Sequence, residues 1–186
     1  MTDRLIGSKV AIVATDGVER IELSEPRRAL QEAGAVVDLL APEGGSIFSM
    51  EHLDRSESFA VDHPVSEADP QEYHGLVLPG GLVNADKLRI DAAAVRFVHA
   101  FLESGRPIGV ICHGAWILIE TGLLGGRTLT SYPTLRTDLE NAGARWVDEE
   151  VHDDDGLVSS RRPQDLPAFN AAIVAEFARR SGAWLG

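Results

Sequence analysis

Residues 108–118 read IGVICHGAWIL, a short apolar run that passes through Cys112, His113 and Gly114 into a second apolar run. The first run is typical of a strand buried on both faces, and the second is expected to be helical. A nucleophilic side chain at a sharp strand-to-helix turn is the pattern of a nucleophile elbow, here with a thiol in place of a hydroxyl. The segment therefore predicts an α/β fold and a reactive cysteine.

The same alternation of short apolar runs and longer amphipathic segments extends in both directions from this turn. Such alternation predicts a mostly parallel sheet covered by helices on both faces. Residues 43–74 are expected to be largely turn-like, with a short strand at 59–61, and Pro26 is expected in the first turn of its helix. The predicted strands are residues 9–14, 36–41, 75–78, 107–111, 128–131, 146–151 and 157–160, and the predicted helices are residues 22–34, 91–104, 113–121 and 166–180.

Composition narrows the classes of protein to consider. A chain of 186 residues with 44% apolar and 25% charged residues suits one globular domain, residues 1–186. The net charge of −12 argues against nucleic acid or an anionic membrane as a partner. The chain has no apolar run of spanning length, no secretory signal and only one cysteine, so a reducing, cytoplasmic location is expected.

Neither a metal nor another cofactor is expected from the sequence. His152 is followed by Asp153, Asp154 and Asp155, but this spacing fits no calcium loop. A solvated hairpin turn that ends in Asp155-Gly156 is the better interpretation. The glycine pairs at residues 44–45 and 125–126 lack the spacing of a phosphate-binding loop.

Three loops at the carboxyl ends of the predicted strands hold the candidate site residues, because ligand sites of such sheets collect there. At the start of a helix, Cys112 would gain thiolate character, and the N–H of His113 would face an oxyanion. The turn at residues 79–81 offers further N–H groups, and Glu22 stands where a strand leads into a helix. Each also has a plainer interpretation: a core cysteine, a simple turn and an exposed glutamate.

Five segments together resemble the PfpI family, the intracellular cysteine protease and general stress protein branch of the class I glutamine amidotransferase-like superfamily. This branch is related to the Parkinson-associated deglycases. The resemblance extends from about residue 9 to residue 177. The segments are KVAIVATDGVERIEL (9–23), LVLPGG (76–81), GVICHGAWIL (109–118), GRTLTSYPTLRTDLENAGARWVDEEV (126–151) and LVSSRRPQDLPAFN (157–170).

The resemblance implies a flavodoxin-like three-layer α/β/α sandwich that forms homodimers or larger homo-oligomers. It also implies a nucleophile at Cys112, a buried Glu22 whose carboxyl group hydrogen-bonds the sulfur, and an oxyanion hole made by the N–H groups of Gly81 and His113. His113 would act as general base and acid, oriented by Asp86 of a neighbouring subunit.

The chain departs from the family pattern in two places. Ala115 stands where the family has proline, and it is followed by the bulky Trp116. Asp86 is one methylene shorter than the usual glutamate. Both changes affect the expected geometry of the pair formed by Cys112 and His113, and they therefore put peptidase activity in question. Trp116, Tyr132 and Arg161 are candidate pocket residues.

The function expected is that of a stress-related, cysteine-dependent hydrolase or lyase. Its substrate would be a peptide or a small carbonyl compound such as a glyoxal or an early glyoxal adduct. The alternative is a redox-sensing or chaperone-like stress protein whose Cys112 is oxidised rather than catalytic.

Overall fold

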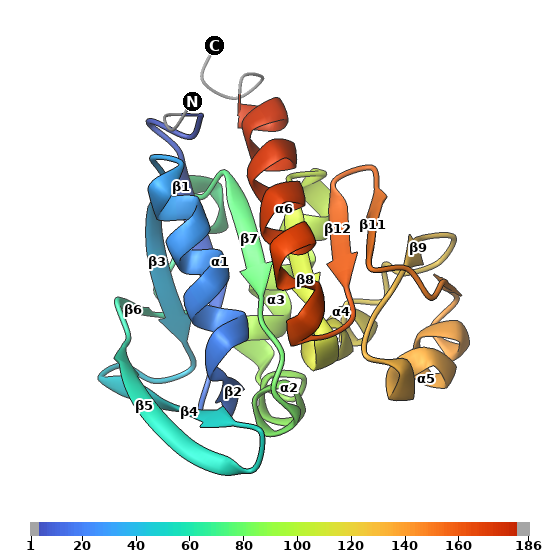
Figure 1. Ribbon diagram of the computed structural model, residues 1–186, viewed down its shortest axis with the longest axis horizontal. Coiled ribbons are helices and arrows are strands. Elements are labelled where there is room, and N and C mark those ends of the chain that lie inside the picture. Colours follow the sequence, from blue (N-terminus) through green and yellow to red (C-terminus); the bar gives the residue numbers. More distant parts are fainter. Residues whose placement is uncertain (1–3, 182–186) are drawn as a thin grey trace.

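The computed structural model describes residues 4–181, and a seven-stranded sheet with the order β11-β12-β8-β7-β1-β3-β6 lies at its centre (Figure 1). Neighbouring strands run parallel, except that β11 is antiparallel to β12. The mostly parallel sheet predicted from the apolar runs is therefore confirmed. Its strands are β1 (Lys9–Val13), β3 (Val36–Ala41), β6 (His63–Pro64), β7 (Gly75–Leu78), β8 (Ile108–Ile111), β11 (Val151–Asp154) and β12 (Leu157–Ser160).

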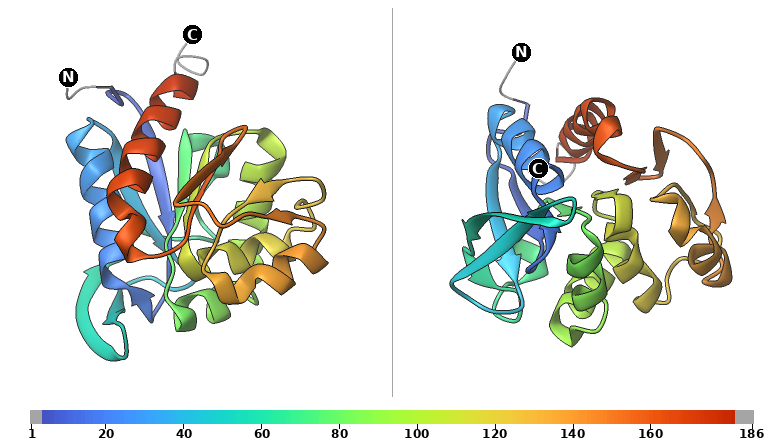
Figure 2. Two further views of the ribbon diagram at one scale, coloured as in Figure 1. Left: turned by 45° about the vertical axis from the view of Figure 1, so that its right-hand side comes forward. Right: turned by 60° about the horizontal axis from the view of Figure 1, so that its bottom comes forward.

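Helices cover both faces of the sheet, which gives three layers. Along β1, Val10 and Ile12 belong to the core under α1 and α6, while Ala11 and Val13 belong to the core under α3 and α4. Successive side chains of a strand point to opposite faces, so each face needs its own apolar cover. Figure 2 shows α1 and α6 side by side over one face. The helices are α1 (Arg20–Glu32), α2 (Leu82–Leu88), α3 (Ala92–Ser104), α4 (Trp116–Glu120), α5 (Arg136–Asn141) and α6 (Leu166–Ser181).

The prediction for residues 43–74 is wrong in one respect, because this segment contains an antiparallel hairpin. Strands β4 (Ser46–Glu51) and β5 (Asp54–Ala60) pair with each other, and β2 (Val18–Glu19) pairs with β4 to make a separate three-stranded sheet. Most β5 side chains are exposed, so the hairpin has no apolar alternation to reveal it.

Three further expectations need correction. Residues 146–151 do not form one strand, since β10 (Arg145–Trp146) pairs with β9 (Thr128–Leu129) and β11 pairs with β12. Helix α1 begins at Arg20, so Pro26 lies in its interior and not in its first turn. The predicted helix at 113–121 is a 3-10 turn, Cys112–Ala115, followed by the short α4.

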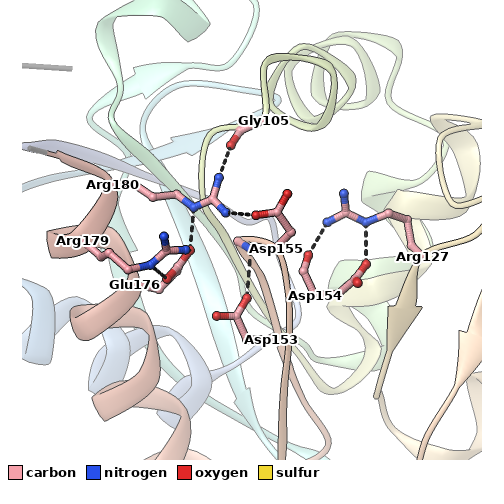
Figure 3. A network of polar contacts seen from close by, with 9 residues as sticks. Gly105, Arg127, Asp153, Asp154, Asp155, Glu176, Arg179 and Arg180 are labelled. Atoms are coloured by element: carbon pink, nitrogen blue, oxygen red, sulfur yellow. Dashed lines mark hydrogen bonds and ion pairs between the residues drawn. The ribbon is translucent and has the colours of Figure 1, made fainter. Parts of the chain in front are cut away.

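The acidic turn between β11 and β12 is bound by arginines at the end of the sheet opposite the carboxyl edge (Figure 3). Arg180 of α6 pairs with Asp155 and Glu176, and Arg127 pairs with Asp154. These contacts join α6 to the β11–β12 turn. Within residues 4–181, no helix has the length and apolarity needed to cross a membrane.

Candidate active site

Cys112 lies at a strained turn directly after β8. Its φ of 60° is in the left-handed region, which non-glycine residues rarely adopt. Gly114 lets this turn pack closely on the end of β7, because a Cβ there would lie 2.4 Å from the carbonyl oxygen of Leu78. The elbow is therefore present, with the sulfur placed by backbone geometry.

Glu22 is fully buried beside this cysteine, although it comes from α1. Its Oε2 accepts a hydrogen bond of 2.9 Å from the N–H of Gly80, and within residues 4–181 Oε1 has no nitrogen or oxygen partner. A Cβ at Gly80 would lie 2.3 Å from Oε2 and 2.7 Å from the Cβ of Cys112. Only glycine at this position lets the carboxyl group and the thiol meet.

Burial controls the protonation of this pair. It raises the pKa of Glu22 from 4.5 to about 8, and the contact with Cys112 and the Gly80 N–H reduce the rise only in part. Glu22 is therefore mainly protonated at neutral pH. Burial, and then the negative charge of an ionised Glu22, also raise the pKa of the Cys112 thiol.

The direction of this thiol shift is opposite to the sequence-based expectation. Cys112 is only 7% exposed, and α4 has five residues, so its dipole is weak. The backbone N–H groups of His113 and Gly81 act against the rise. When Glu22 holds its proton, its unfavourable charge is absent, and the two N–H groups then act against burial, which still raises the thiol pKa.

His113 adjoins the sulfur. Its Nδ1 lies 3.2 Å from the Sγ of Cys112, and its ring stacks on Tyr132 with the ring centroids 4.5 Å apart. Burial lowers the pKa of His113, so its imidazole is neutral at pH 7 and can accept a proton. Tyr132 in turn donates its backbone N–H to the carbonyl oxygen of Cys112 at 3.2 Å.

Asn84 holds two of the site loops together, and sequence reasoning missed it. Its buried side-chain amide donates to the carbonyl oxygens of Pro79 and Gly80, and its Oδ1 accepts from the N–H of Thr15 at 2.7 Å. The loops after β1 and β7 are thereby fixed to each other. Buried asparagine at a helix start has no distinctive sequence pattern, so only the structure reveals it.

A cleft of about 490 Å³ opens above the sulfur. Its volume is within the range of small-molecule sites. The predicted residues Cys112, His113, Glu22, Gly81 and Tyr132 all line it. The remaining lining residues, which the sequence did not single out, are Glu19, His52, Leu53, Leu82, Arg162, Pro163 and Gln164.

Two predicted pocket residues lie outside this lining. Arg161 is held away from the cleft by ion pairs of 2.8 Å with Asp148 and Asp165. Trp116 touches the His113 ring edge-on, and its indole N–H donates to Asp138 at 2.9 Å. Trp116 thus contacts His113 but does not line the cleft.

Asp86 does not meet His113 of the same chain within the part that the structure describes. It is exposed on α2, next to the exposed apolar residues Leu82 and Val83. The expected contact from a neighbouring subunit therefore stays a prediction. In the same described part, no group of three or more His, Cys, Asp or Glu side chains is arranged to hold a metal ion.

The model of the DJ-1/PfpI family matches residues 8–176 of the chain. The chain is 40% identical to "Deglycase TK1284" of Thermococcus kodakarensis over 166 residues, 89% of this chain and 97% of the relative. It is 37% identical to "General stress protein 18" of Bacillus subtilis over 171 residues, 91% of this chain and 98% of the relative.

Among solved structures, Drosophila melanogaster DJ-1beta superposes with a TM-score of 0.83 at 24% identity, covering 92% of this chain and 90% of that chain. At this identity the likeness concerns the fold. It agrees with the three-layer arrangement described above.

Proposed function

Because the chain belongs to the DJ-1/PfpI family, we propose that it is a cysteine-dependent enzyme whose Cys112 thiolate adds to a carbonyl carbon. The observation that carries the proposal is the convergence of four groups on one sulfur at the bottom of an open cleft. These groups are the His113 imidazole, the Glu22 carboxyl group and the backbone N–H groups of Gly81 and His113.

The first step transfers the thiol proton to the neutral Nδ1 of His113, and the sulfur then bonds to the carbonyl carbon. The carbonyl oxygen becomes an oxyanion that the N–H groups of Gly81 and His113 can hold. Glu22 stays protonated at neutral pH, so it adds no opposing charge and can donate a hydrogen bond to the sulfur.

For a 2-oxoaldehyde, the His113 imidazolium returns its proton to the oxyanion, and the neutral imidazole can then move the proton from the former aldehyde carbon to the neighbouring carbon. The adduct becomes a thioester of a 2-hydroxy acid, and water releases the acid and restores the thiol. The overall reaction, RCOCHO + H₂O → RCH(OH)COOH, balances without an oxidant or a reductant. The chemistry thus requires only the groups that line the cleft.

A small dicarbonyl fits this site better than a peptide. Peptide cleavage must protonate an amine leaving group, which calls for a well-oriented histidine. Within one chain, no acidic side chain of residues 4–181 contacts the His113 ring, so peptide cleavage would depend on an acid from a second copy. Addition to an aldehyde has no leaving group, so it does not require His113 to be held in the orientation that protonates an amine. The name of the deglycase relative supports this preference, and peptides remain the alternative substrates.

The test compares wild type with Cys112→Ser for methylglyoxal consumption, lactate formation and cleavage of a fluorogenic peptide. We expect wild type to form lactate and Cys112→Ser to lose at least about 100-fold in kcat/KM while it keeps its circular dichroism spectrum. Full turnover by the serine variant would eliminate the mechanism. A wild type that turns over neither substrate, but gains oxygen at Cys112 in mild peroxide, would favour the redox alternative.

We also propose that the enzyme works as a cytoplasmic homodimer or larger homo-oligomer. The lone thiol suits a reducing compartment. The exposed apolar residues of α2 beside Asp86 suit a contact with a second copy.

A further inference from the structure

Two consecutive arginines, Arg161 and Arg162, follow β12 and point in different directions. The backbone of Arg162 is extended, with φ −165° and ψ 169°, and successive side chains of an extended chain point to opposite sides. Arg161 turns toward Asp148 and Asp165 and pairs with both. Arg162 turns instead into the cleft that holds Cys112.

The buried guanidinium nitrogen Nε of Arg162 has no partner among the residues that the structure describes. This nitrogen is shielded from solvent, and within residues 4–181 it makes no hydrogen bond. The chain has 29 acidic and only 17 basic side chains, so acceptors for an arginine are abundant. A buried donor without an acceptor is unfavourable, and guanidinium groups bind carboxylates through paired N–H donors.

Two carboxyl groups also line the cleft, and among residues 4–181 neither pairs with Arg162. Glu22 belongs to the buried pair with Cys112, and Glu19 accepts the backbone N–H of His52 at 3.2 Å. The backbone at Arg162 is fixed for two reasons. Pro163 restricts the preceding residue to an extended conformation, and the carbonyl oxygen of Arg162 accepts a hydrogen bond of 3.0 Å from the N–H of Asp165. The Arg162 backbone is thus fixed beside the cleft, and its cationic side chain lines the substrate space.

We propose that Arg162 selects substrates that carry a carboxylate beyond the reacting carbonyl, so that the enzyme prefers 2-oxoaldehydes with an anionic end. This inference rests on the proposed function. Cys112 would bond to the aldehyde carbon while Arg162 holds the carboxylate at the far end of the molecule. The product of hydration is then a 2-hydroxy dicarboxylic acid.

The test uses two substrates of equal chain length, 4,5-dioxopentanoate and the uncharged 2-oxopentanal. We expect wild type to favour 4,5-dioxopentanoate by about tenfold or more in kcat/KM, the size of effect typical of a charged hydrogen bond. Arg162→Gln should lose this preference by slowing the anionic substrate alone. Arg162→Lys should keep part of it, since the charge remains but the paired N–H donors are lost.

A matched control removes a positive charge elsewhere. Arg145→Gln changes an exposed arginine of β10 that does not line the cleft, so it should retain the wild-type preference. Equal turnover of the two substrates by wild type would overturn the proposal. So would an equal loss on both substrates in Arg162→Gln, or the same loss of preference in Arg145→Gln.

A second readout does not depend on turnover. The rate of Cys112 alkylation by anionic iodoacetate, divided by the rate with neutral iodoacetamide, should exceed the same ratio for free N-acetylcysteine. It should fall in Arg162→Gln and not in Arg145→Gln. If neither aldehyde is consumed, the proposed function fails, and the alkylation ratio alone then tests the anion site at Arg162. A ratio in Arg162→Gln equal to that of wild type rejects the anion site. A lower ratio in Arg162→Gln supports it.

Discussion

A fully buried carboxyl group with a single backbone donor is costly to ionise, and Glu22 is such a group. Its pKa of about 8 lies above the 4.5 expected of the unfolded chain. The folded protein therefore holds a proton that the unfolded chain releases. Stability from this proton is fully present below pH 4.5 and is lost as the pH rises through about 8.

Glu22→Gln should remove this pH dependence, because glutamine is neutral throughout. Relative to the variant, wild type should lose stability between about pH 4.5 and 8, by up to about 1.4 kcal/mol for each unit of pKa shift. Urea unfolding of both proteins at several pH values measures the difference. Glu43→Gln, at an exposed position, is the control, and parallel curves for wild type and Glu22→Gln would refute the buried-acid account.

At the scale of single residues, the sequence predicted some residues of the candidate site and could not predict others. Glu22 and Cys112 lie next to sharp turns with recognisable neighbours, so the pattern and the family resemblance both pointed to them. Arg161 and Arg162 are chemically identical neighbours in sequence. Which of them reaches the cleft depends on the positions of Asp148 and Asp165, and no local pattern carries that information.

At the scale of elements, burial decides what the sequence reveals. The strands β1, β7 and β8 lie inside the sheet and have almost entirely buried side chains, so they stand out as apolar runs. In the β4–β5 hairpin most β5 side chains are exposed, and the sequence predicted only a short strand at 59–61 there. The tip of the hairpin nevertheless reaches the candidate site, because His52 and Leu53 line the cleft.

The hairpin tip should affect binding without affecting folding. Leu53 is 92% exposed and lines the cleft, so an apolar substrate would cover it. Leu53→Ser should raise KM for 2-oxopentanal by roughly fivefold, about 1 kcal/mol of apolar burial, with kcat unchanged. The thermal midpoint should not move. Ile90→Ser, at an 83% exposed position outside the cleft lining, should leave both kinetic constants unchanged. An equal shift in both variants would exclude a role for the hairpin.

At the scale of the whole molecule, the two ends of the parallel strands differ. The carboxyl ends carry the candidate site, and the opposite ends carry ion pairs. Glu22, Gly80 and Cys112 come from three separate segments, and the parallel order of β1, β7 and β8 brings them to the carboxyl edge. The opposite edge is tied by Arg180 and its acidic partners (Figure 3). The rule that sites collect at carboxyl ends predicted this placement. A single chain, however, leaves the His113 ring without an acidic partner among its described residues.

A second copy could supply that partner. Asp86 is exposed on α2 beside the exposed Leu82 and Val83, as expected of a residue in a contact between subunits. If Asp86 acts across the interface, Cys112→Ser and Asp86→Asn subunits should complement each other. A mixed dimer then contains one complete site, made of Cys112 from one subunit and Asp86 from the other. Random pairing at equal amounts should restore about a quarter of the wild-type sites.

Co-expression of the two variants with different affinity tags provides the measurement, because sequential purification isolates the mixed dimer. Its turnover of methylglyoxal should exceed that of either variant alone and approach half the wild-type value for each dimer. Two results would show that Asp86 does not complete the partner's site: a mixed dimer no more active than Asp86→Asn alone, or an active wild type that sediments as a monomer. His113 would then act on Cys112 without an acidic partner from the second chain.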